Sequence, residues 1–338
     1  MKLKVGIIGA GSISHRHMEA YSKNLKVKSV CITDPDKQAR EKFSERYSVE
    51  SFTDNYEKML EDKSINLVDI CAPPYLHHRM TIDSLEAGKD VICEKPIAMT
   101  LEEADDMIAT AKKLGRRLFI EMNQRFMPYH QKARELMESG QIGKPFMTIF
   151  NIAGNELPKM SDPDSWKGSW DRAGGGAMFD TGYHAVYVME HFFGRTKSVC
   201  AIARRLVVPH ENKADDNTSA VLEFDAVLGT ISVSYSVTSE RWNEERHIYG
   251  TKGSIHIADI PINPLVLVKN NNSEIVKIDH PPNVHPHAHS VKRCLDYYVD
   301  CVLDDKESEV TPEEARDALE VVLAMYKSSD RGERIYFR

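Results

Sequence analysis

The sequence lacks any hydrophobic run long enough to cross a membrane. No stretch of its 338 residues approaches the ~18 apolar residues that a membrane-spanning helix requires. The apolar run that ends at Ile8 is shorter than the hydrophobic region of a signal peptide and leads straight into a glycine turn. We therefore expect no membrane partner and a cytoplasmic location.

The sequence also has no excess of positive charge. Its 44 lysines and arginines are outnumbered by 51 aspartates and glutamates, which gives a net charge of −7. We therefore expect no nucleic-acid partner. Hydrophobic residues make up 41% of the chain, enough for a packed core, and the length predicts two domains.

Cysteine is scarce and scattered. The six cysteines include no C-x-x-C pair, and several lie inside apolar runs such as residues 30–32. This pattern favours buried, reduced thiols of a cytosolic protein over disulfides or a metal site. We therefore expect no bound metal.

What the sequence does have is a regular alternation of strand and helix patterns over residues 1–122. The strands are almost continuously apolar, which is typical of a parallel sheet covered by helices on both faces. We predict an α/β Rossmann domain with a doubly wound parallel sheet over these residues. Its expected strands are residues 4–8, 26–33, 67–72, 90–93 and 117–121, and its expected helices are residues 15–22, 37–47, 55–60, 78–87 and 101–114.

From residue 123 the pattern changes. Between residues 197 and 268, consecutive strands are joined by short turns, which predicts a mainly antiparallel sheet. We predict an α+β domain over residues 123–338, whose last helix, residues 312–329, could pack back on the Rossmann domain. Its other expected elements are helices at residues 129–139, 181–193 and 290–303, a strand at residues 145–152 and a Trp- and Gly-rich loop at residues 161–176.

The first strand ends in a turn that is typical of dinucleotide binding. Gly9-Ala10-Gly11-Ser12-Ile13-Ser14 has the pattern G-x-G-x-x-S between a strand and a helix. The first glycine permits a tight turn, the second lets the backbone approach a pyrophosphate, and the last position needs only a small residue for packing. We therefore predict that Gly9, Gly11, Ser12 and Ile13 bind the cofactor.

Asp34 follows the second strand, twenty residues after Ser14. A carboxylate at this position can accept hydrogen bonds from the adenosine ribose, which favours the free 2′-hydroxyl of NAD and repels the 2′-phosphate of NADP. The alternative is an ordinary turn aspartate. Because the glycine turn precedes it, we predict the ribose role and expect NAD rather than NADP.

Two further segments carry residues suited to proton and hydride transfer. Glu94-Lys95-Pro96 follows a strand at its carboxyl end, where open α/β sheets bind ligands. The glycine turn at residues 174–176 opens a helix that places Asp180 and His184 four residues apart, on one face. The alternatives are a solvated lysine, a helix-capping aspartate and a structural histidine.

Over essentially its whole length, the sequence resembles the Gfo/Idh/MocA oxidoreductase family, which includes glucose–fructose oxidoreductase and inositol dehydrogenase relatives. The combination of Glu-Lys-Pro with Asp-x-x-x-His is quite specific, whereas either motif alone would be weak. The other matching segments are the first glycine turn, residues 72–77, 123–126, 174–184 and 250–253, and the closing helix with Tyr326.

The resemblance implies a cofactor, an assembly and a set of site residues. It implies NAD(P) on the Rossmann domain and a large, open sheet in the second domain that often forms the subunit interface, so we expect a homodimer or homotetramer. It also implies that Lys95, Asp180 and His184 form the catalytic group. To the cofactor-binding residues it adds Ala72, Pro73, Pro74, His77, Glu94, Lys95 and Asn123, and it assigns substrate binding to Lys95, Arg125, Trp166, Lys167, Asp180 and His184.

These residue types fit the oxidation of a secondary alcohol, in which carbon loses a hydride to nicotinamide and oxygen loses a proton. An imidazole, with an ordinary pKa of ~6.5, suits a base near neutral pH, so we assign this role to His184. Lys95 would hold the hydroxyl and stabilise negative charge on its oxygen. Asp180 would orient His184 or Lys95, or bind a neighbouring hydroxyl. Alternatively, Lys95 with a lowered pKa takes the proton itself.

Several other side chains allow two interpretations. Trp166-Lys167 stands where family members often carry a Trp-Arg pair near the nicotinamide, so it either keeps that basic role in altered form or packs in a loop. Arg125 either lines the cleft or pairs structurally. The stretch His280–His289 suits a loop near the active site better than a metal site. We expect structural roles for His15 and His17, and core or interface positions for Tyr235 and Trp242.

The leading hypothesis is an NAD-dependent dehydrogenase acting on a CH–OH group of a sugar, nucleotide sugar, inositol or related polyol. One alternative retains NAD and uses transient oxidation to hydrolyse a glycoside. The other is a non-enzymatic, nucleotide-responsive sensor; loss of Lys95 or His184 would indicate it, and both are present. The substrate itself is not specified, because a fold supports many functions.

Overall fold

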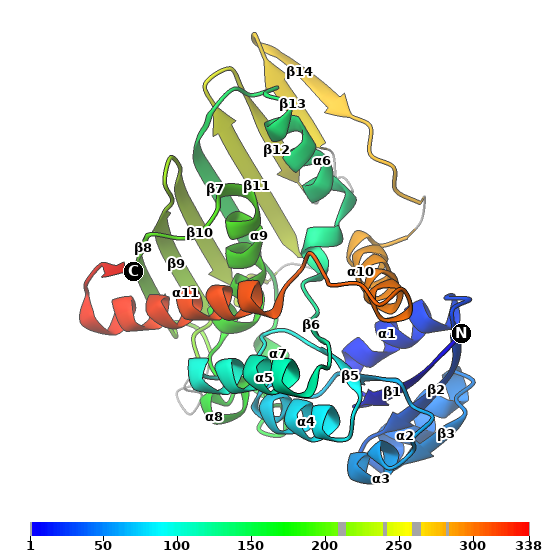
Figure 1. Cartoon of the computed structure of the whole chain (residues 1–338). Helices are drawn as coiled ribbons and strands as arrows, with labels where there is room; N and C mark the ends of the chain where they lie inside the picture. The colour runs from blue at the N-terminus through cyan, green and yellow to red at the C-terminus, as the bar shows by residue number, and fades with distance from the viewer. Residues whose placement is uncertain (1, 209–213, 239–241, 259–264, 282–283, 338) are drawn as a thin grey trace. The chain divides into compact units, whose positions relative to one another are not determined.

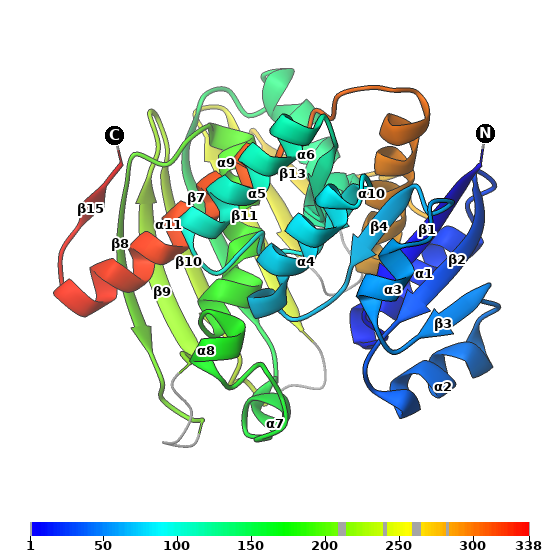
Figure 2. The ribbon, with the colours of Figure 1, turned by 60° about the horizontal axis from the view of Figure 1, so that its bottom comes forward.

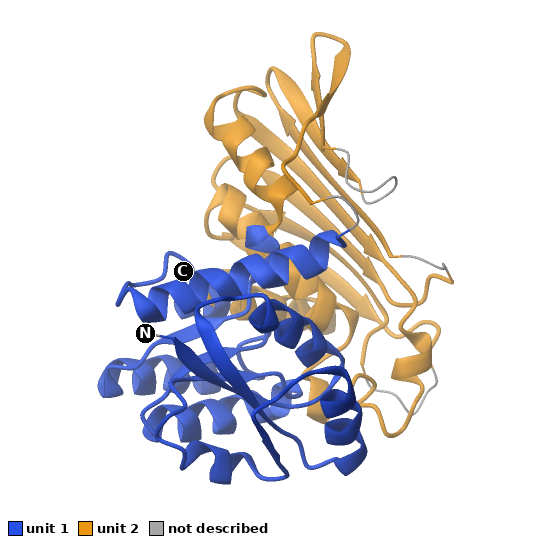
Figure 3. Ribbon diagram, turned by 90° about the vertical axis from the view of Figure 1, so that its right-hand side faces the viewer, with its two compact units in different colours: residues 1–126, 284–316 blue, residues 127–283, 317–338 orange. Residues whose placement is uncertain are grey.

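The computed structural model describes residues 2–208, 214–238, 242–258, 265–281 and 284–337. They form two compact units, residues 1–126 with 284–316 and residues 127–283 with 317–338 (Figure 3). Helix α10 (Pro286–Leu303) belongs to the first unit, whereas α11 (Pro312–Arg331) starts in the first unit and continues in the second. The domain boundary after residue 122 and the packing of the last helix on the Rossmann domain stay predictions.

The first unit follows the expected alternation of strands and helices. Its elements are β1 (Leu3–Ile8), α1 (Ser12–Ser22), β2 (Val27–Thr33), α2 (Lys37–Arg46), β3 (Ser51–Thr53), α3 (Tyr56–Leu60), β4 (Leu67–Ile70), α4 (Pro74–Glu86), β5 (Asp90–Cys93), α5 (Leu101–Leu114), β6 (Leu118–Ile120) and the 3₁₀ turn η1 (Asn123–Phe126). The strands form one parallel sheet in the order β3-β2-β1-β4-β5-β6, and Figure 1 shows β1, β2 and β3 side by side. This is the Rossmann order, so the predicted fold of this unit is confirmed. Strands β4 and β5 are buried along their whole length, as a sheet with two covered faces requires.

The second unit is built on a nine-stranded sheet. Its elements are α6 (Pro128–Glu138), β7 (Pro145–Ala153), α7 (Leu157–Met160), α8 (Trp170–Ala173), the π-helical turn η2 (Met178–Gly182), α9 (Tyr183–Phe193), β8 (Ser198–Arg204), β9 (Asn217–Glu223), β10 (Leu228–Ser234), β11 (Asn243–Gly250), β12 (Gly253–Ala258), β13 (Leu265–Lys269), β14 (Asn272–Val276) and β15 (Ile335–Tyr336). The strand order is β14-β13-β12-β11-β7-β10-β9-β8-β15, and β7 and β10 are the one parallel pair among these described strands. The prediction of a mainly antiparallel sheet is confirmed.

Helices α9 and α11 cover one face of this sheet (Figure 2). A Cβ at Gly229 on β10 would lie 3.3 Å from the Met189 sulfur of α9, and the Ser328 hydroxyl of α11 accepts the Ala201 N–H of β8 at 3.0 Å. The inward residues of β9 and β10 alternate with outward ones, which is the pattern of a sheet with one covered face.

Two helix starts differ from the sequence-based expectation. Helix α10 begins at Pro286 and not at residue 290, because proline fits the first helical position and the His285 side chain accepts the His287 N–H at 3.3 Å. The helix expected from residue 181 is preceded by η2, a π-helical turn of the kind that is frequent at functional sites. None of the described helices is long and apolar enough to span a membrane.

Candidate active site

The predicted phosphate-binding turn is the sharp connection between β1 and α1. Gly9 has a φ of +106°, and a Cβ there would lie 2.7 Å from the Cys71 carbonyl oxygen, so only glycine fits. A Cβ at Gly11, the N-cap of α1, would meet no atom within 4 Å. The buried Ser14 hydroxyl donates to the Gly11 carbonyl at 2.7 Å. Ser12 and Ile13 begin the helix, and the first N–H groups of a helix are of the kind that bind a pyrophosphate.

Asp34 lies directly after β2, and its carboxylate contacts the glycine turn. Its Oδ2 accepts the Ala10 N–H at 2.7 Å, and its Oδ1 accepts the Asp36 N–H at 2.8 Å. The second bond is that of a turn aspartate, whereas the first brings the carboxylate to the glycine turn. The Arg40 guanidinium donates to the Asp34 backbone carbonyl. Asp34 and Arg40 therefore lie together after the carboxyl end of β2, and the contact of Asp34 with a ribose stays a prediction.

The segment after β4 is tied to the segment after β5 by His77. Ala72 and Pro73 lead into α4, whose first residue is Pro74. The buried His77 ring has its two nitrogens 2.8 Å from the carbonyl oxygens of Ala72 and Pro96. Burial lowers the pKa of His77, so the ring is neutral and donates to one carbonyl at a time. His77 thus holds backbone in place, and its contact with a cofactor stays a prediction.

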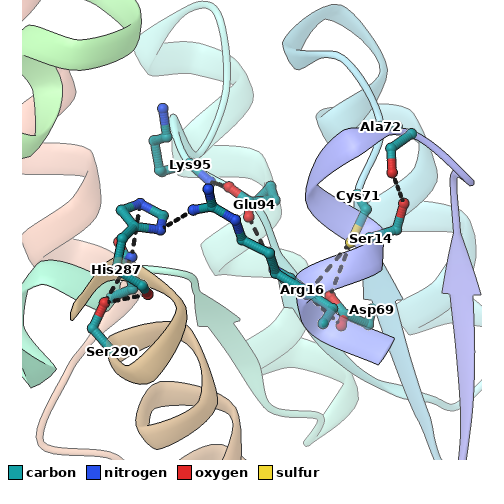
Figure 4. A network of polar contacts seen from close by, with 12 residues as sticks. Ser14, Arg16, Asp69, Cys71, Ala72, Glu94, Lys95, His287 and Ser290 are labelled. Carbon is teal, nitrogen blue, oxygen red and sulfur yellow. Dashed lines mark hydrogen bonds and ion pairs between the residues drawn. The ribbon is translucent and has the colours of Figure 1, made fainter. Parts of the chain in front are cut away.

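Glu94 is held by hydrogen bonds within a buried polar network (Figure 4). Its Oε2 accepts the Lys95 N–H at 3.1 Å, and its Oε1 is 3.0 Å from Nε2 of His17. Nδ1 of His17 is 2.7 Å from Asp69, which also accepts the Tyr21 hydroxyl at 2.7 Å. Burial alone would lower the pKa of His17, but the Asp69 carboxylate raises it well above its ordinary value. A charged imidazolium therefore joins two carboxylates and orients the residue that precedes Lys95.

The same network holds a group of potential metal ligands. The ligand atoms of His17, Asp69 and Cys71 lie within 4.8 Å of one another. Nδ1 of His17, which contacts Asp69, is also 3.4 Å from the Cys71 sulfur. Burial and the Asp69 carboxylate raise the pKa of the Cys71 thiol. The three side chains are therefore joined by hydrogen bonds, and the expectation that no metal is bound stays a prediction.

The start of α10 carries a second polar group of the first unit, in which Figure 4 labels His287 and Ser290, and Asn123 contacts both. The Asn123 amide donates to the Ser290 hydroxyl at 3.1 Å and is 3.2 Å from Nε2 of His287, whose Nδ1 contacts the Arg16 guanidinium. Burial and Arg16 lower the pKa of His287 to about 3, and Lys95 contributes in the same direction. The His-rich stretch thus supplies a neutral imidazole to the group that includes Asn123; residues 282–283 of that stretch lie outside the described residues.

Arg125 forms an ion pair within the first unit. Its guanidinium donates to the Glu314 carboxylate at 2.6 Å, and its side chain is 10% exposed. The same Glu314 oxygen accepts the Thr311 N–H at 2.9 Å at the start of α11. This contact is the structural pairing that the sequence allowed as an alternative. The predicted contact of Arg125 with substrate is untested and stays a prediction.

In the second unit, Asp180 is part of a compact charged cluster. Its carboxylate accepts from the Lys167 ammonium at 2.9 Å and from the Tyr235 hydroxyl at 2.7 Å, and Lys167 also pairs with Glu156 at 3.2 Å. The Lys167 nitrogen lies 5.7 Å from the centre of the Trp166 ring. Burial works against the charged ammonium, but the carboxylates raise the pKa of Lys167. Asp180 therefore has a cation and a phenol as partners, so it does not act only as a helix cap.

His184 lies in the first turn of α9, four residues after Asp180, and is 7% exposed. Its Nδ1 is 2.8 Å from the Tyr187 hydroxyl. If Nδ1 carries the proton and donates to Tyr187, Nε2 has a lone pair that can accept one from a substrate. This is the tautomer that a general base requires.

Two members of the Asp180 cluster were missed by sequence reasoning. Tyr235 follows β10, in which Ile231 and Val233 point inward, so the pattern predicts that Tyr235 points inward too. Its expected core position is correct. The contact of its hydroxyl with Asp180 is what the sequence did not predict. Glu156 is buried at 7% exposure next to Lys167, and no local pattern marks it. An inward tyrosine at a strand end was the only available signal.

The partly buried Glu190 of α9 gives a testable pH dependence. Burial raises the pKa of Glu190 to about 7, although the Thr196 N–H donates to it at 3.0 Å. The folded state thus holds this proton more tightly than the unfolded state, so the contribution to stability is full at low pH and is lost as pH rises through 7. Glu190→Gln should raise the free energy of unfolding by up to ~3 kcal/mol at pH 8 and by little at pH 5. Denaturant unfolding at both pH values checks this, with the more exposed Glu135→Gln as control; equal effects at both pH values would contradict it.

Comparison with known proteins places this geometry in a family. Residues 3–122 match the oxidoreductase family with an NAD-binding Rossmann fold, and residues 130–256 match the GFO/IDH/MocA C-terminal domain. The D-glucoside 3-dehydrogenase of Escherichia coli (strain K12) is 27% identical over 98% of this chain and 97% of its own length. The myo-inositol 2-dehydrogenase of Thermotoga maritima is 28% identical over 78% of each chain.

Solved structures show the same fold over the whole length. A levoglucosan dehydrogenase in complex with NADH superposes with a TM-score of 0.90 at 20% identity, covering 100% of both chains. An oxidoreductase domain protein from Kribbella flavida gives a TM-score of 0.91 at 23% identity, again covering 100% of both chains. With both of its domains matched, this chain belongs to the Gfo/Idh/MocA family of oxidoreductases.

Proposed function

We propose that this protein is an NAD-dependent dehydrogenase that transfers a hydride between nicotinamide and a secondary alcohol of a sugar, nucleotide sugar, inositol or related polyol. The relatives named as glucoside and inositol dehydrogenases support this substrate class. The observation that carries the proposal is the Asp180 cluster beside His184 in the second unit of a chain whose first unit is an NAD-binding Rossmann domain.

The residues of the first unit fit a bound dinucleotide. Gly9, Gly11, Ser12 and Ile13 would hold the pyrophosphate, and Asp34 would accept the ribose hydroxyls, because a Cβ at Gly11 would meet open space and Asp34 closes onto the same turn. The segments 72–74 and 94–95, with Asn123, would line the rest of the cofactor site. When bound, NAD supplies the hydride acceptor, the C4 carbon of its nicotinamide.

The proposed catalytic roles follow from the chemistry of three side chains. His184 accepts the hydroxyl proton at Nε2 while Nδ1 donates to Tyr187. Lys95 donates to the substrate oxygen and stabilises the negative charge that develops there. Asp180 binds a neighbouring hydroxyl and is held for that role by Lys167 and Tyr235. Lys95 remains the alternative base.

The charge of the Asp180 cluster favours a neutral substrate group at this point. The two ammonium groups of Lys167 and Lys159 pair with the two carboxylates of Asp180 and Glu156. The cluster therefore has no surplus positive charge to attract a carboxylate or phosphate. Hydroxyl groups of a sugar or inositol ring, which both donate and accept hydrogen bonds, match carboxylate and ammonium partners well.

We also propose that the protein assembles as a homodimer or homotetramer through the outward face of the nine-stranded sheet. Ile202, Val221 and Leu228 lie on that face of β8, β9 and β10 and are 60%, 43% and 50% exposed. Clustered apolar side chains of this kind mark interaction surfaces. We place the protein in the cytoplasm, which the six unpaired cysteines support. The glycoside hydrolase and sensor alternatives gain no support from the relatives described above.

Cofactor selectivity tests the role of Asp34. Asp34→Ala should reduce the preference for NAD over NADP at least ~10-fold, because the repulsion of the 2′-phosphate is lost and Arg40 stays nearby. The ratio of kcat/KM for the two cofactors measures this. Asp36→Ala, which removes the nearby cap of α2, is the control. An unchanged ratio in Asp34→Ala would remove the ribose assignment.

The proposed function itself is tested by absorbance at 340 nm. Purified protein is incubated with NAD and a panel of sugars, inositols and nucleotide sugars. A substrate-dependent rise supports a dehydrogenase and identifies the substrate class. No rise with any compound, together with NAD that remains on the protein, would contradict the proposal.

A further inference from the structure

The helical segment that carries Asp180 and His184 begins with four N–H groups that are satisfied from distant parts of the chain. A helix has no partners of its own for its first N–H groups. Here, the Gly176 and Met178 N–H groups donate to the two carboxylate oxygens of Asp215, at 2.9 and 3.1 Å, and the Ala177 N–H donates to the Asp215 carbonyl at 2.8 Å. The Phe179 N–H donates to the Tyr326 hydroxyl oxygen at 3.1 Å.

Asp215 and Tyr326 are themselves joined. The Tyr326 hydroxyl donates to Asp215 Oδ1 at 2.6 Å, and the Thr218 hydroxyl donates to Asp215 Oδ2 at 2.7 Å. All three side chains are buried. Burial and the Asp215 carboxylate raise the pKa of Tyr326 well above its ordinary value, so the phenol keeps its proton and stays a donor. Asp215 and Tyr326 therefore form one connected unit, which we call the Asp215–Tyr326 clamp.

The clamp also explains the glycines at the start of this segment. A Cβ at Gly175 would lie 2.4 Å from the Tyr326 hydroxyl oxygen, and a Cβ at Gly176 would lie 1.8 Å from the Asp215 carbonyl oxygen. No other residue type allows so close an approach. Tyr326 comes from α11, which Figure 1 shows passing the start of α9. The contact therefore joins α11 to the start of the helical segment that carries Asp180 and His184.

We propose that Asp215 and Tyr326 are positioning residues that fix the start of the helical segment on which Asp180 and His184 stand. We propose no contact between the substrate and either of these two residues. The proposal rests on the function proposed above, because it assigns the clamp a part in the same reaction. It adds two residues to the proposed reaction, Asp215 just before β9 and Tyr326 on α11. Both would act through the backbone of residues 176–179.

The clamp can be tested without any catalytic assay. Tyr326→Phe removes the hydroxyl that bonds Asp215 and the Phe179 N–H, but it keeps the ring. Amide hydrogen exchange over residues 176–184 should become at least ~10-fold faster in this variant. The control is Tyr336→Phe, in which the same atom is removed from a side chain that is 67% exposed. Exchange in Tyr326→Phe that matches the wild type would overturn the proposal.

The second test asks whether the clamp serves the reaction. With a substrate from the panel, Tyr326→Phe should lower kcat at least ~10-fold, because small misplacements of reacting groups are costly. The KM for NAD should stay unchanged, because the cofactor residues lie in the other unit. Asp215→Asn should have the same signature, and Tyr326→Phe decides alone if Asp215→Asn fails to fold.

The two tests separate failure of this inference from failure of the proposed function. If the wild type is an active dehydrogenase and Tyr326→Phe has the kinetic constants of Tyr336→Phe, the positioning role is overturned and the function stands. If the wild type oxidises nothing in the panel, the proposed function fails, and the positioning role fails with it even where hydrogen exchange confirms the clamp.

Discussion

His184→Ala should lower kcat at least ~100-fold while the affinity for NADH stays near the wild-type value. The substitution removes the imidazole that accepts the substrate proton, whereas the proposed NADH contacts lie in the first unit. Steady-state kinetics and NADH titration by fluorescence measure the two quantities. Added imidazole should restore part of the turnover, because a small base can enter the space that the side chain leaves.

The matched control is His191→Ala, which removes an imidazole from the same helix, where it contacts Arg134. It should leave kcat within a few-fold of the wild type. If turnover survives in His184→Ala, the base lies elsewhere, and Lys95 becomes the leading candidate. Equal losses in the two variants would instead indicate damage to α9 as a whole.

Gly176→Ala should destabilise the protein by roughly 3 kcal/mol or more, a loss that few single substitutions reach. The added Cβ would lie 1.8 Å from the Asp215 carbonyl oxygen, a backbone atom that accepts the Ala177 N–H at 2.8 Å and cannot move away without losing that hydrogen bond. The hydrogen bonds that satisfy the start of the helix would be broken in the same shift. Chemical denaturation followed by circular dichroism measures the effect.

Gly11→Ala provides the contrast. A Cβ at Gly11 would meet no protein atom within 4 Å, and the residue has a φ of −78°, which alanine adopts readily. Its stability should stay near the wild type, while NAD binding should weaken, because the methyl group occupies the space assigned to the pyrophosphate. If Gly176→Ala unfolds at the same denaturant concentration as the wild type, the close approach of residues 176 and 215 is wrong.

The Rossmann unit could be predicted well because its signals are local. Apolar strands such as β4 and β5 are continuous in the sequence, and the Gly9 and Gly11 spacing needs only six neighbouring residues to be recognised. Because parallel strands follow each other through helices, their alternation predicts the sheet. The predicted start of α10 was four residues too late, because a histidine cap at His285 in a His- and Pro-rich stretch is indistinguishable from a loop in the sequence.

The surroundings of Asp180 could be predicted only in part, because they depend on contacts between distant residues. Lys167 and Asp180 were both recognised, but nothing in the sequence says that they pair with each other. Tyr235 and Tyr326 come from a strand end and the last helix, 55 and 147 residues from the groups that they bind. Such partners become visible only when the fold brings the segments together. The roles assigned to individual site residues stay predictions until the variants are measured.

The transfer of hydride from a substrate carbon to NAD can be followed with deuterium. The best substrate from the panel, deuterated at its carbinol carbon, is incubated with the enzyme and NAD, and the released nicotinamide cofactor is examined by proton NMR. We expect one deuterium at C4 of the released NADH, transferred to a single face, and none when Lys95→Ala replaces the wild type. NADH without deuterium, or deuterium that is found again in the sugar product while NAD is unchanged, would contradict it.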